Sequence, residues 1–212
     1  MKKGAIDYSL YLVTDQGLSR GRSLSAVVAK AVYGGVTCVQ VRAKKESTRD
    51  FIDQAGSIQP FLKEQKVPLI INDRLDVAQA VRADGVHLGQ SDMPIEMARA
   101  IVGQEMVIGI SAECLEHALS AQKAGADYIG AGAVFATSTK TDIAPPMGLG
   151  GLQRICATVT IPVVAIGGIN RANAAGVMQA GADGIAVVSA IVAADDCRKA
   201  AQNLSTIIQK SR

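Results

Sequence analysis

Short apolar runs of strand length alternate with segments of helical periodicity along the whole chain. Eight runs predict strands at Ser9–Thr14, Cys38–Arg42, Pro68–Ile71, Gly85–Leu88, Met106–Ser111, Tyr128–Phe135, Pro162–Ile169 and Gly184–Ile191. Eight further segments predict helices at Ser23–Tyr33, Thr48–Gln65, Leu75–Ala83, Pro94–Val102, Glu113–Ala124, Leu149–Thr158, Arg171–Ala180 and Asp195–Gln209. Strict alternation is typical of a parallel sheet covered by helices, and eight right-handed units allow closure. We therefore expect an α/β protein, a single-domain (β/α)8 TIM barrel over residues 1–212.

The main alternative to a closed barrel is an open, doubly wound sheet. No Gly-x-Gly-x-x-Gly follows the first expected strand and no reversal of strand order is evident, so the barrel is favoured. Repeated phrases end four helices directly before strands, and their glycines are expected to supply the left-handed residue that stops a helix. These structural phrases are Tyr33-Gly-Gly-Val, Ala83-Asp-Gly-Val, Ala124-Gly-Ala-Asp-Tyr-Ile and Ala180-Gly-Ala-Asp-Gly-Ile.

Composition adds a view of the core and of the partners. Apolar residues make up 49% of the 212 residues and aromatic residues only 3%, which predicts an aliphatic core. The 22 basic residues exceed the 19 acidic ones by 3, a balance that favours neither a nucleic-acid surface nor an acidic tail. No apolar run approaches the roughly 20 residues that span a bilayer, and no signal peptide is evident. We expect a cytoplasmic protein that binds neither nucleic acid nor membranes.

Cysteine and histidine usage limits the possible chemistry. The four cysteines are far apart, lack a Cys-x-x-Cys spacing and read as small buried hydrophobes in a reducing compartment. Only His87 and His117 are present, and His117 has the setting of a helix surface. A Ser-His-Asp triad or a zinc site of His and Cys is therefore not favoured.

Two acidic residues follow successive expected strands in the stretch from Pro68 to Asp92. Asp73 comes after the third strand and Asp92 after the fourth, so both are expected at the rim where parallel strands end. A helix cap at Asp73 and a turn role for Asp92 before Pro94 are the simpler explanations for each residue alone. Together the two acids favour Mg²⁺, which takes one or two carboxylates and completes its shell with water and phosphate.

The second expected strand carries charges on one face. Gln40, Arg42 and Lys44 alternate with Val41 and Ala43, so the three polar residues point the same way toward the rim. Buried cations require an anionic partner. A phosphate group is one candidate, and internal ion pairs with Asp73 or Asp92 are the alternative.

The longest irregular connection follows the sixth expected strand. Thr137, Ser138, Thr139 and Lys140 offer three hydroxyls and a positive charge, which suit a phosphate or carboxylate. Long loops after barrel strands are usually functional. A merely solvated loop is the alternative.

The last two expected strands carry features of a phosphate site. Gly167 and Gly168 end the seventh strand, and Val188 and Ser189 end the eighth, where many TIM barrels bind phosphate on backbone N–H groups. Two separate anion sites, one metal-assisted and sized for a diphosphate and one for a monophosphate, would make a two-substrate enzyme.

Two further polar residues lie in the middle strands. Ser111 either donates to an anion or caps the next helix, and we weigh these two roles equally. His87 is in phase with Gly85 and Gly89, which would leave room for a ligand beside its ring. A core histidine paired to the backbone is the commoner explanation.

Taken together, these motifs resemble the thiamine-phosphate synthase family over nearly the whole chain. The residues that carry the resemblance are Tyr11-Leu-Val-Thr-Asp15, Gly35-Val-Thr-Cys-Val-Gln-Val-Arg-Ala-Lys44, Ile70-Ile-Asn-Asp-Arg74, Gly85-Val-His-Leu-Gly-Gln-Ser-Asp92, Thr137-Ser-Thr-Lys140, Gly167-Gly-Ile169 and Val188-Ser-Ala-Ile191. The resemblance implies a TIM-barrel transferase of two small phosphorylated substrates. Such an enzyme joins an aminopyrimidine methyl diphosphate to a thiazole phosphate and releases pyrophosphate. A homo-oligomer is left open.

The resemblance also implies a role for each matched residue. The pyrimidine diphosphate would be bound by Gln40, Val41, Arg42, Ala43, Lys44, Asn72, His87, Ser111 and Lys140, among which Arg42, Lys44, Ser111 and Lys140 would be catalytic. The thiazole phosphate would be bound by Thr137, Ser138, Thr139, Gly168, Val188 and Ser189. Mg²⁺ would be held by Asp73 and Asp92.

One position departs from the family, and two other functions remain open. Ala43 stands where the family usually has an acid, and it is expected to affect packing or rim charge more than ligand binding because it points off the Gln40 face. A thiazole tautomerase would share the barrel but has no diphosphate to ionise. A catalytically silent sensor of thiamine precursors would not need the full set of charged residues.

Overall fold

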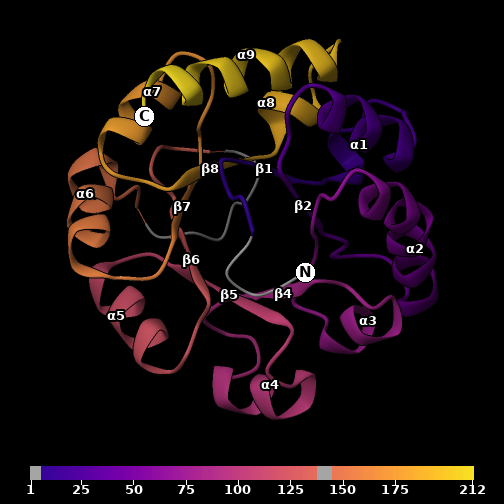
Figure 1. Ribbon diagram of the computed structural model, residues 1–212, viewed down its shortest axis with the longest axis horizontal. Helices are drawn as coiled ribbons and strands as arrows, with labels where there is room; N and C mark the ends of the chain where they lie inside the picture. The colour runs from indigo at the N-terminus through magenta and orange to yellow at the C-terminus, as the bar shows by residue number, and fades with distance from the viewer. Residues whose placement is uncertain (1–5, 138–144) are drawn as a thin grey trace.

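The computed structural model describes residues 6–137 and 145–212, and its centre is a closed barrel of eight parallel strands (Figure 1). Neighbours in the barrel are neighbours in the chain, and the last strand pairs with the first. The strands are β1 Leu10–Val13, β2 Cys38–Val41, β3 Leu69–Asn72, β4 Gly85–Leu88, β5 Val107–Ala112, β6 Tyr128–Ala131, β7 Val163–Ile166 and β8 Gly184–Val187. The expected TIM barrel is confirmed, and the open sheet is not the fold.

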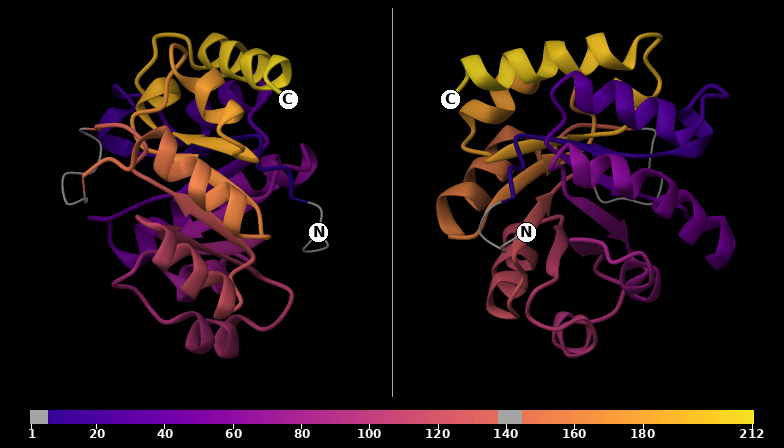
Figure 2. Two further views of the ribbon diagram at one scale, coloured as in Figure 1. Left: turned by 90° about the vertical axis from the view of Figure 1, so that its left-hand side faces the viewer. Right: turned by 45° about the vertical axis from the view of Figure 1, so that its right-hand side comes forward.

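Helices surround the barrel as an outer layer, as Figures 1 and 2 show. Ser23, Ser47 and Asp196 cap α1, α2 and α9 by accepting backbone N–H groups of the first turn. The last and first parts of the chain meet where α9 packs along α1. The described helices are η2 Gln16–Leu18, α1 Leu24–Tyr33, α2 Thr48–Glu64, α3 Leu75–Ala80, α4 Ile95–Val102, α5 Leu115–Lys123, α6 Gly148–Thr158, α7 Ala174–Gln179, α8 Ser189–Val192 and α9 Cys197–Lys210. None of them combines the length and apolar character that a membrane span requires.

The last three strands end earlier than their apolar runs predict. β6 stops at Ala131. β7 stops at Ile166, because Gly167 and Gly168 after it adopt left-handed φ angles of 101° and 65°. β8 stops at Val187, and the residues after it form the short helix α8 instead of more strand. The runs continue past the strands because Val134, Ile169 and Ile191 are buried in loops and in α8. Apolar character alone does not distinguish these conformations.

The repeated phrases lie at the N-terminal end of the barrel. Left-handed glycines end three of the helices as expected, but before β4 the left-handed residue is Arg82 (φ 51°) and not a glycine. The aspartates of the phrases have a role of their own. Each accepts a backbone N–H from the first or second residue of another strand, and these bonds are Leu69 N–H to Asp84, Ile108 N–H to Asp127 and Val163 N–H to Asp183.

The core has two layers with different chemistry. Between the barrel and the helices it is mostly aliphatic, and Phe51 is the one aromatic side chain among its described buried residues, as the composition predicts. Inside the barrel the prediction is wrong, because Tyr8, Tyr11 and Tyr128 pack there against each other and against small aliphatic residues. Gly109 makes this possible: a Cβ at this position would lie 2.1 Å from Cζ of Tyr128.

The four cysteines are free and are not built as a reactive centre. Cys38 and Cys197 are buried, while Cys114 and Cys156 are half-buried. Burial raises the pKa of the Cys156 thiol to about 11 and raises that of Cys38 well above its ordinary value. The two thiols therefore stay protonated at neutral pH, in keeping with packing roles.

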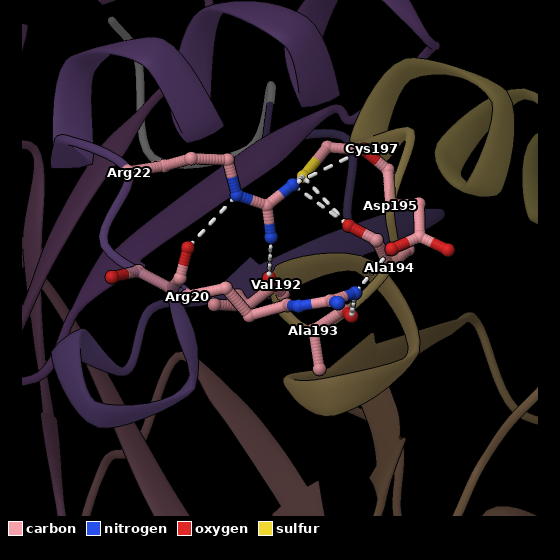
Figure 3. Close-up of polar contacts among 8 residues, drawn as sticks. Arg20, Arg22, Val192, Ala193, Ala194, Asp195 and Cys197 are labelled. Carbon is pink, nitrogen blue, oxygen red and sulfur yellow. Dashed lines mark hydrogen bonds and ion pairs between the residues drawn. The ribbon is translucent and has the colours of Figure 1, made fainter.

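One arginine fastens α8 to the loop after β1 (Figure 3). The Arg22 guanidinium donates to the carbonyl oxygens of Val192 at 2.6 Å and Ala194 at 2.7 Å, and through Nε to Ser19 at 2.8 Å. The nearby Arg20 also reaches this segment, but its ion pair with Asp195 is largely exposed. Arg22 thus satisfies the carbonyl groups left unpaired where α8 ends.

We expect Arg22→Ala to destabilise the protein by roughly 2 kcal/mol, because several charge-assisted bonds to half-buried carbonyl groups are lost together. Arg20→Ala is the matched control, and an exposed ion pair predicts a loss of at most about 1 kcal/mol. Urea unfolding of the two variants measures the difference. Equal losses of stability would contradict the anchoring role of Arg22.

Candidate active site

A cavity of about 460 Å³ opens at the carboxyl ends of the barrel strands, and side chains from the strands and from the loops after them line it. This is the end of a TIM barrel at which active sites are found. Of the residues predicted from the sequence, the cavity is lined by Gln40, Arg42, Lys44, Asn72, Asp73, His87, Asp92, Ser111, Thr137, Gly168, Val188 and Ser189. Ser138, Thr139 and Lys140 lie outside the described residues.

Two predicted residues of β2 and its extension do not line the cavity. The Val41 side chain is fully buried in the aliphatic layer between barrel and helices, and Ala43 packs against the same layer. Both therefore point away from the face that Gln40, Arg42 and Lys44 share, as the alternation along a strand requires. Ala43 therefore lies in the packed layer and off the Gln40 face, as the alternation predicts, and its small effect on ligand binding stays a prediction.

Asp73 and Asp92 meet at the rim. Asp73 follows β3 in a left-handed conformation (φ 62°), a position that Asp tolerates better than most residues. Burial raises the pKa of the Asp73 carboxyl, and the adjacent Asp92 carboxyl raises it further, whereas Lys44 partly offsets both effects. A cation between the acids would remove the repulsion that favours protonation.

Of the two simpler roles, a helix cap at Asp73 and a turn at Asp92, the structure shows only the second. Arg74 occupies the N-cap position of α3, and no side chain caps that helix, so Asp73 is not a cap. Asp92 does hold a turn, because its Oδ2 accepts the Gly89 N–H at 2.6 Å. Pro94 is the N-cap residue of α4 rather than its first helical residue.

The donor set fits magnesium better than zinc. Within residues 6–137 and 145–212, no three His, Cys, Asp or Glu side chains are grouped closely enough to hold a metal by themselves. Two carboxylates without a third protein ligand suit a hard cation that keeps water or binds substrate phosphate. A structural zinc site would require about four protein ligands.

The cations of the rim already have acidic neighbours. Lys44 forms an ion pair with Asp73, one of the two acids considered as internal partners. Arg42 instead approaches Asp15 at 3.4 Å, and both side chains are about one-fifth exposed. Asp15 follows β1 and also caps η2 by accepting the Leu18 N–H. Both cations remain part of the cavity wall, where an anionic ligand could reach them.

Asn72 presents an unsatisfied donor at the end of β3. The residue is only 8% exposed, and its Nδ2 has no hydrogen-bond partner among the described residues. Buried amide groups without partners are rare in folded proteins. Because Asn72 lines the cavity, this donor is suited to an acceptor oxygen of a ligand.

His87 and Ser111 are joined to each other. His87 Nε2 lies 2.9 Å from Ser111 Oγ, and Nδ1 lies 2.9 Å from the Tyr128 hydroxyl. His87 is therefore paired to side chains, not only to backbone as a core histidine would be. The N-cap position of α5 is Cys114, so Ser111 is not the cap of that helix.

The glycines expected to leave room beside His87 do not do so. Side chains of Ile70 and Val107 fill the space next to Gly85, and Asp92 fills that next to Gly89. The space for the His87 ring comes instead from Gly130, where a Cβ would lie 2.8 Å from Cε1 of the ring. His117 is half-buried on α5 and does not line the cavity.

Sequence reasoning missed several residues of the cavity. Tyr11 and Tyr128 line its floor, and Gln90 and Glu113 lie in its wall. The signal for Tyr128 was present in the sequence, because a large residue on β6 pairs in register with Gly109 on β5. Tyr11 is in phase with Val13 on the inward face of β1, and both side chains are buried inside the barrel.

Comparisons with known proteins agree over nearly the full length. The family model described as thiamine monophosphate synthase matches residues 10–191. The thiamine-phosphate synthase of Chloroflexus aurantiacus is 56% identical over 96% of this chain and 94% of its own, and that of Clostridium novyi is 55% identical over 95% and 99%. A solved structure of thiamine phosphate pyrophosphorylase from Pyrococcus furiosus is 44% identical, with a TM-score of 0.91 over 97% of this chain and 98% of that one. The chain therefore belongs to the thiamine monophosphate synthase family, whose members are transferases of thiamine biosynthesis.

Proposed function

We propose that this chain joins an aminopyrimidine methyl diphosphate to a thiazole phosphate, giving thiamine monophosphate and pyrophosphate. The observation that carries the proposal is the grouping of two acids, two cations and an unsatisfied amide donor at one side of the cavity. These are Asp73, Asp92, Arg42, Lys44 and Asn72. A group of this kind suits a diphosphate bound with a divalent cation.

Each residue on the diphosphate side of the cavity is assigned a role in binding the pyrimidine diphosphate. Arg42 and Lys44 donate to diphosphate oxygens and exchange their present acidic neighbours for the ligand. The Asn72 amide donates its unpaired N–H, and Ser111 donates its hydroxyl from β5. Lys140, outside the described residues, is assigned to the same leaving group. Gln40 and His87 contact the pyrimidine ring.

Magnesium held by Asp73 and Asp92 would neutralise charge on the diphosphate. The bond between the pyrimidine methylene carbon and the diphosphate oxygen breaks, and its electron pair leaves with pyrophosphate. Arg42 and Lys44 stabilise that growing negative charge, which is where preorganised cations act most strongly. The electron-rich aminopyrimidine carries the transient positive charge until the thiazole nitrogen attacks the methylene carbon. This route requires no strong general base.

The second substrate occupies the opposite side of the cavity. Gly168, Val188 and Ser189 follow β7 and β8, where loop backbone N–H groups of TIM barrels bind phosphate. Thr137 lines the same cavity, and Ser138 and Thr139 are assigned to this phosphate with it. The two small phosphorylated substrates are the partners in this proposal, without nucleic acid or a membrane, and the cytoplasm is its compartment.

The purified protein should release pyrophosphate when both substrates and Mg²⁺ are present. Omitting either substrate, or removing Mg²⁺ with a chelator, should abolish release because each takes part in the same step. A thiazole tautomerase would convert its thiazole without the pyrimidine substrate and without Mg²⁺. Thiazole isomerisation in the absence of pyrophosphate release would therefore replace this proposal with that function.

A further inference from the structure

Five side chains form one continuous chain of hydrogen bonds across the cavity floor. Gln40 Nε2 donates to the Tyr11 hydroxyl at 2.9 Å, and the Tyr11 and Tyr128 hydroxyl oxygens lie 2.9 Å apart. Tyr128 continues to His87 Nδ1 and His87 Nε2 to Ser111 Oγ, again at 2.9 Å each. This chain of hydrogen bonds begins at Gln40 on β2 and ends at Ser111 on β5, and both of these residues line the cavity.

The middle of this chain is closed to water and stays neutral. Tyr11 is 2% exposed and Tyr128 is fully buried. Burial raises the pKa of both phenols well above the ordinary value, so each keeps its single proton. A hydroxyl with one proton that accepts a hydrogen bond from one neighbour in the chain is free to donate to the other. The direction of donation is therefore passed along the chain.

The Gln40 end sets that direction. An amide NH₂ group can only donate, so Tyr11 accepts from Gln40 and gives its own proton to Tyr128. Tyr128 then donates to Nδ1 of His87, and a neutral imidazole that accepts at Nδ1 carries its proton on Nε2. Nε2–H donates to Ser111 Oγ, which leaves the serine proton free to point into the cavity.

We propose that this chain holds His87 as the Nε2–H tautomer and thereby fixes Gln40 as an acceptor and Ser111 as a donor toward the ligand. Tyr11 and Tyr128 are then positioning residues for the two ends. Such polarity selects a ligand with a hydrogen-bond donor at one end and an acceptor or anionic oxygen at the other. The identity of these ligand groups rests on the proposed function: the donor is the exocyclic amine of the pyrimidine at Gln40, and the anionic oxygen belongs to the diphosphate at Ser111.

The tautomer of His87 shows in which direction the five side chains donate their hydrogen bonds. If the Gln40 amide were turned so that its oxygen met Tyr11, every donor and acceptor would reverse and His87 would carry its proton on Nδ1. Ser111 would then donate to His87 and offer the ligand only an acceptor. The two arrangements thus predict different protonated nitrogens on one ring.

Nuclear magnetic resonance can distinguish the two nitrogens in the free protein. A ¹⁵N-labelled His117→Gln variant leaves His87 as the sole histidine. At about pH 8, where an ordinary histidine is neutral, long-range ¹H–¹⁵N correlations should show a protonated Nε2 and an unprotonated Nδ1. The Nδ1–H form, or a mixture of both forms, would overturn the proposal. The free protein needs no substrate, so this result is independent of turnover.

Two tyrosine variants test the link to the substrate. Tyr128→Phe keeps the ring but breaks the chain, so the tautomers should mix and kcat/KM for the pyrimidine diphosphate should fall about 10-fold, with KM for the thiazole phosphate unchanged. Tyr8→Phe is the control, because the Tyr8 ring packs 4.6 Å from that of Tyr128 while its hydroxyl is not a link of the chain. Identical spectra and kinetics in the two variants would contradict the role of the chain. If His87 carries its proton on Nε2 but the protein releases no pyrophosphate, the proposed direction of the hydrogen bonds is supported and the proposed function is contradicted.

Discussion

Asp92→Asn is expected to reduce pyrophosphate release by about 10²-fold or more while the protein remains folded. The amide keeps an oxygen that can accept the Gly89 N–H, so the turn before α4 survives the change. It removes one of the two negative charges that face each other at the rim, and a neutral ligand holds Mg²⁺ less well. The loss should therefore appear in metal affinity as well as in turnover.

The control for this substitution is Asp76→Asn, the same chemical change on the outer surface of the barrel. Asp76 is 60% exposed and pairs with Arg74, and it does not line the cavity. Both variants should unfold at similar temperatures, and only Asp92→Asn should weaken Mg²⁺ binding in a calorimetric titration with an unreactive diphosphate analogue. Turnover near that of the unaltered protein would remove Asp92 from the proposed metal site.

The first residues of the strands could be predicted from the sequence, whereas the points at which β6, β7 and β8 end could not. A buried parallel strand is apolar on both faces, so each run marks a strand that the helices cover. Beyond Ala131, Ile166 and Val187 the chain stays apolar because loops and α8 cover the same barrel end. Backbone conformation then decides the boundary, and the left-handed angles at Gly167 and Gly168 end β7 at Ile166, before its apolar run ends.

The inward face of β2 and the acids of β3 and β4 were also predictable, because alternation and strand ends place them. Their partners were not. Arg42 meets Asp15, which lies 27 positions earlier, and only the closure of β1 onto β2 brings them together. The tyrosine chain was missed for the same reason, since Tyr11 and Tyr128 are 117 positions apart. The sequence pattern predicts which face of a strand a side chain occupies. Which residue it contacts across the barrel is known only from the closed structure.

Ser189→Asp is expected to weaken binding of the thiazole phosphate by at least roughly 10-fold and to leave binding of the pyrimidine diphosphate nearly unchanged. Ser189 is the first residue of α8 and lines the cavity beside Val188, on the side away from Asp73 and Asp92 in the proposed arrangement. A carboxylate there would repel a phosphate, and an acidic residue in the first turn of a helix is otherwise favourable to the fold.

The matched control is Ser47→Asp, which introduces the same charge where no substrate is proposed. Ser47 caps α2 and is exposed, and Asp is an equally good cap. Each substrate should be titrated separately by calorimetry, with Mg²⁺ and an unreactive analogue on the diphosphate side. Independent loss at Ser189 supports two anion sites served by different strands of one barrel. Equal loss of both affinities would mean that the substrates share one anion pocket, and the two-substrate division of the cavity would then be wrong.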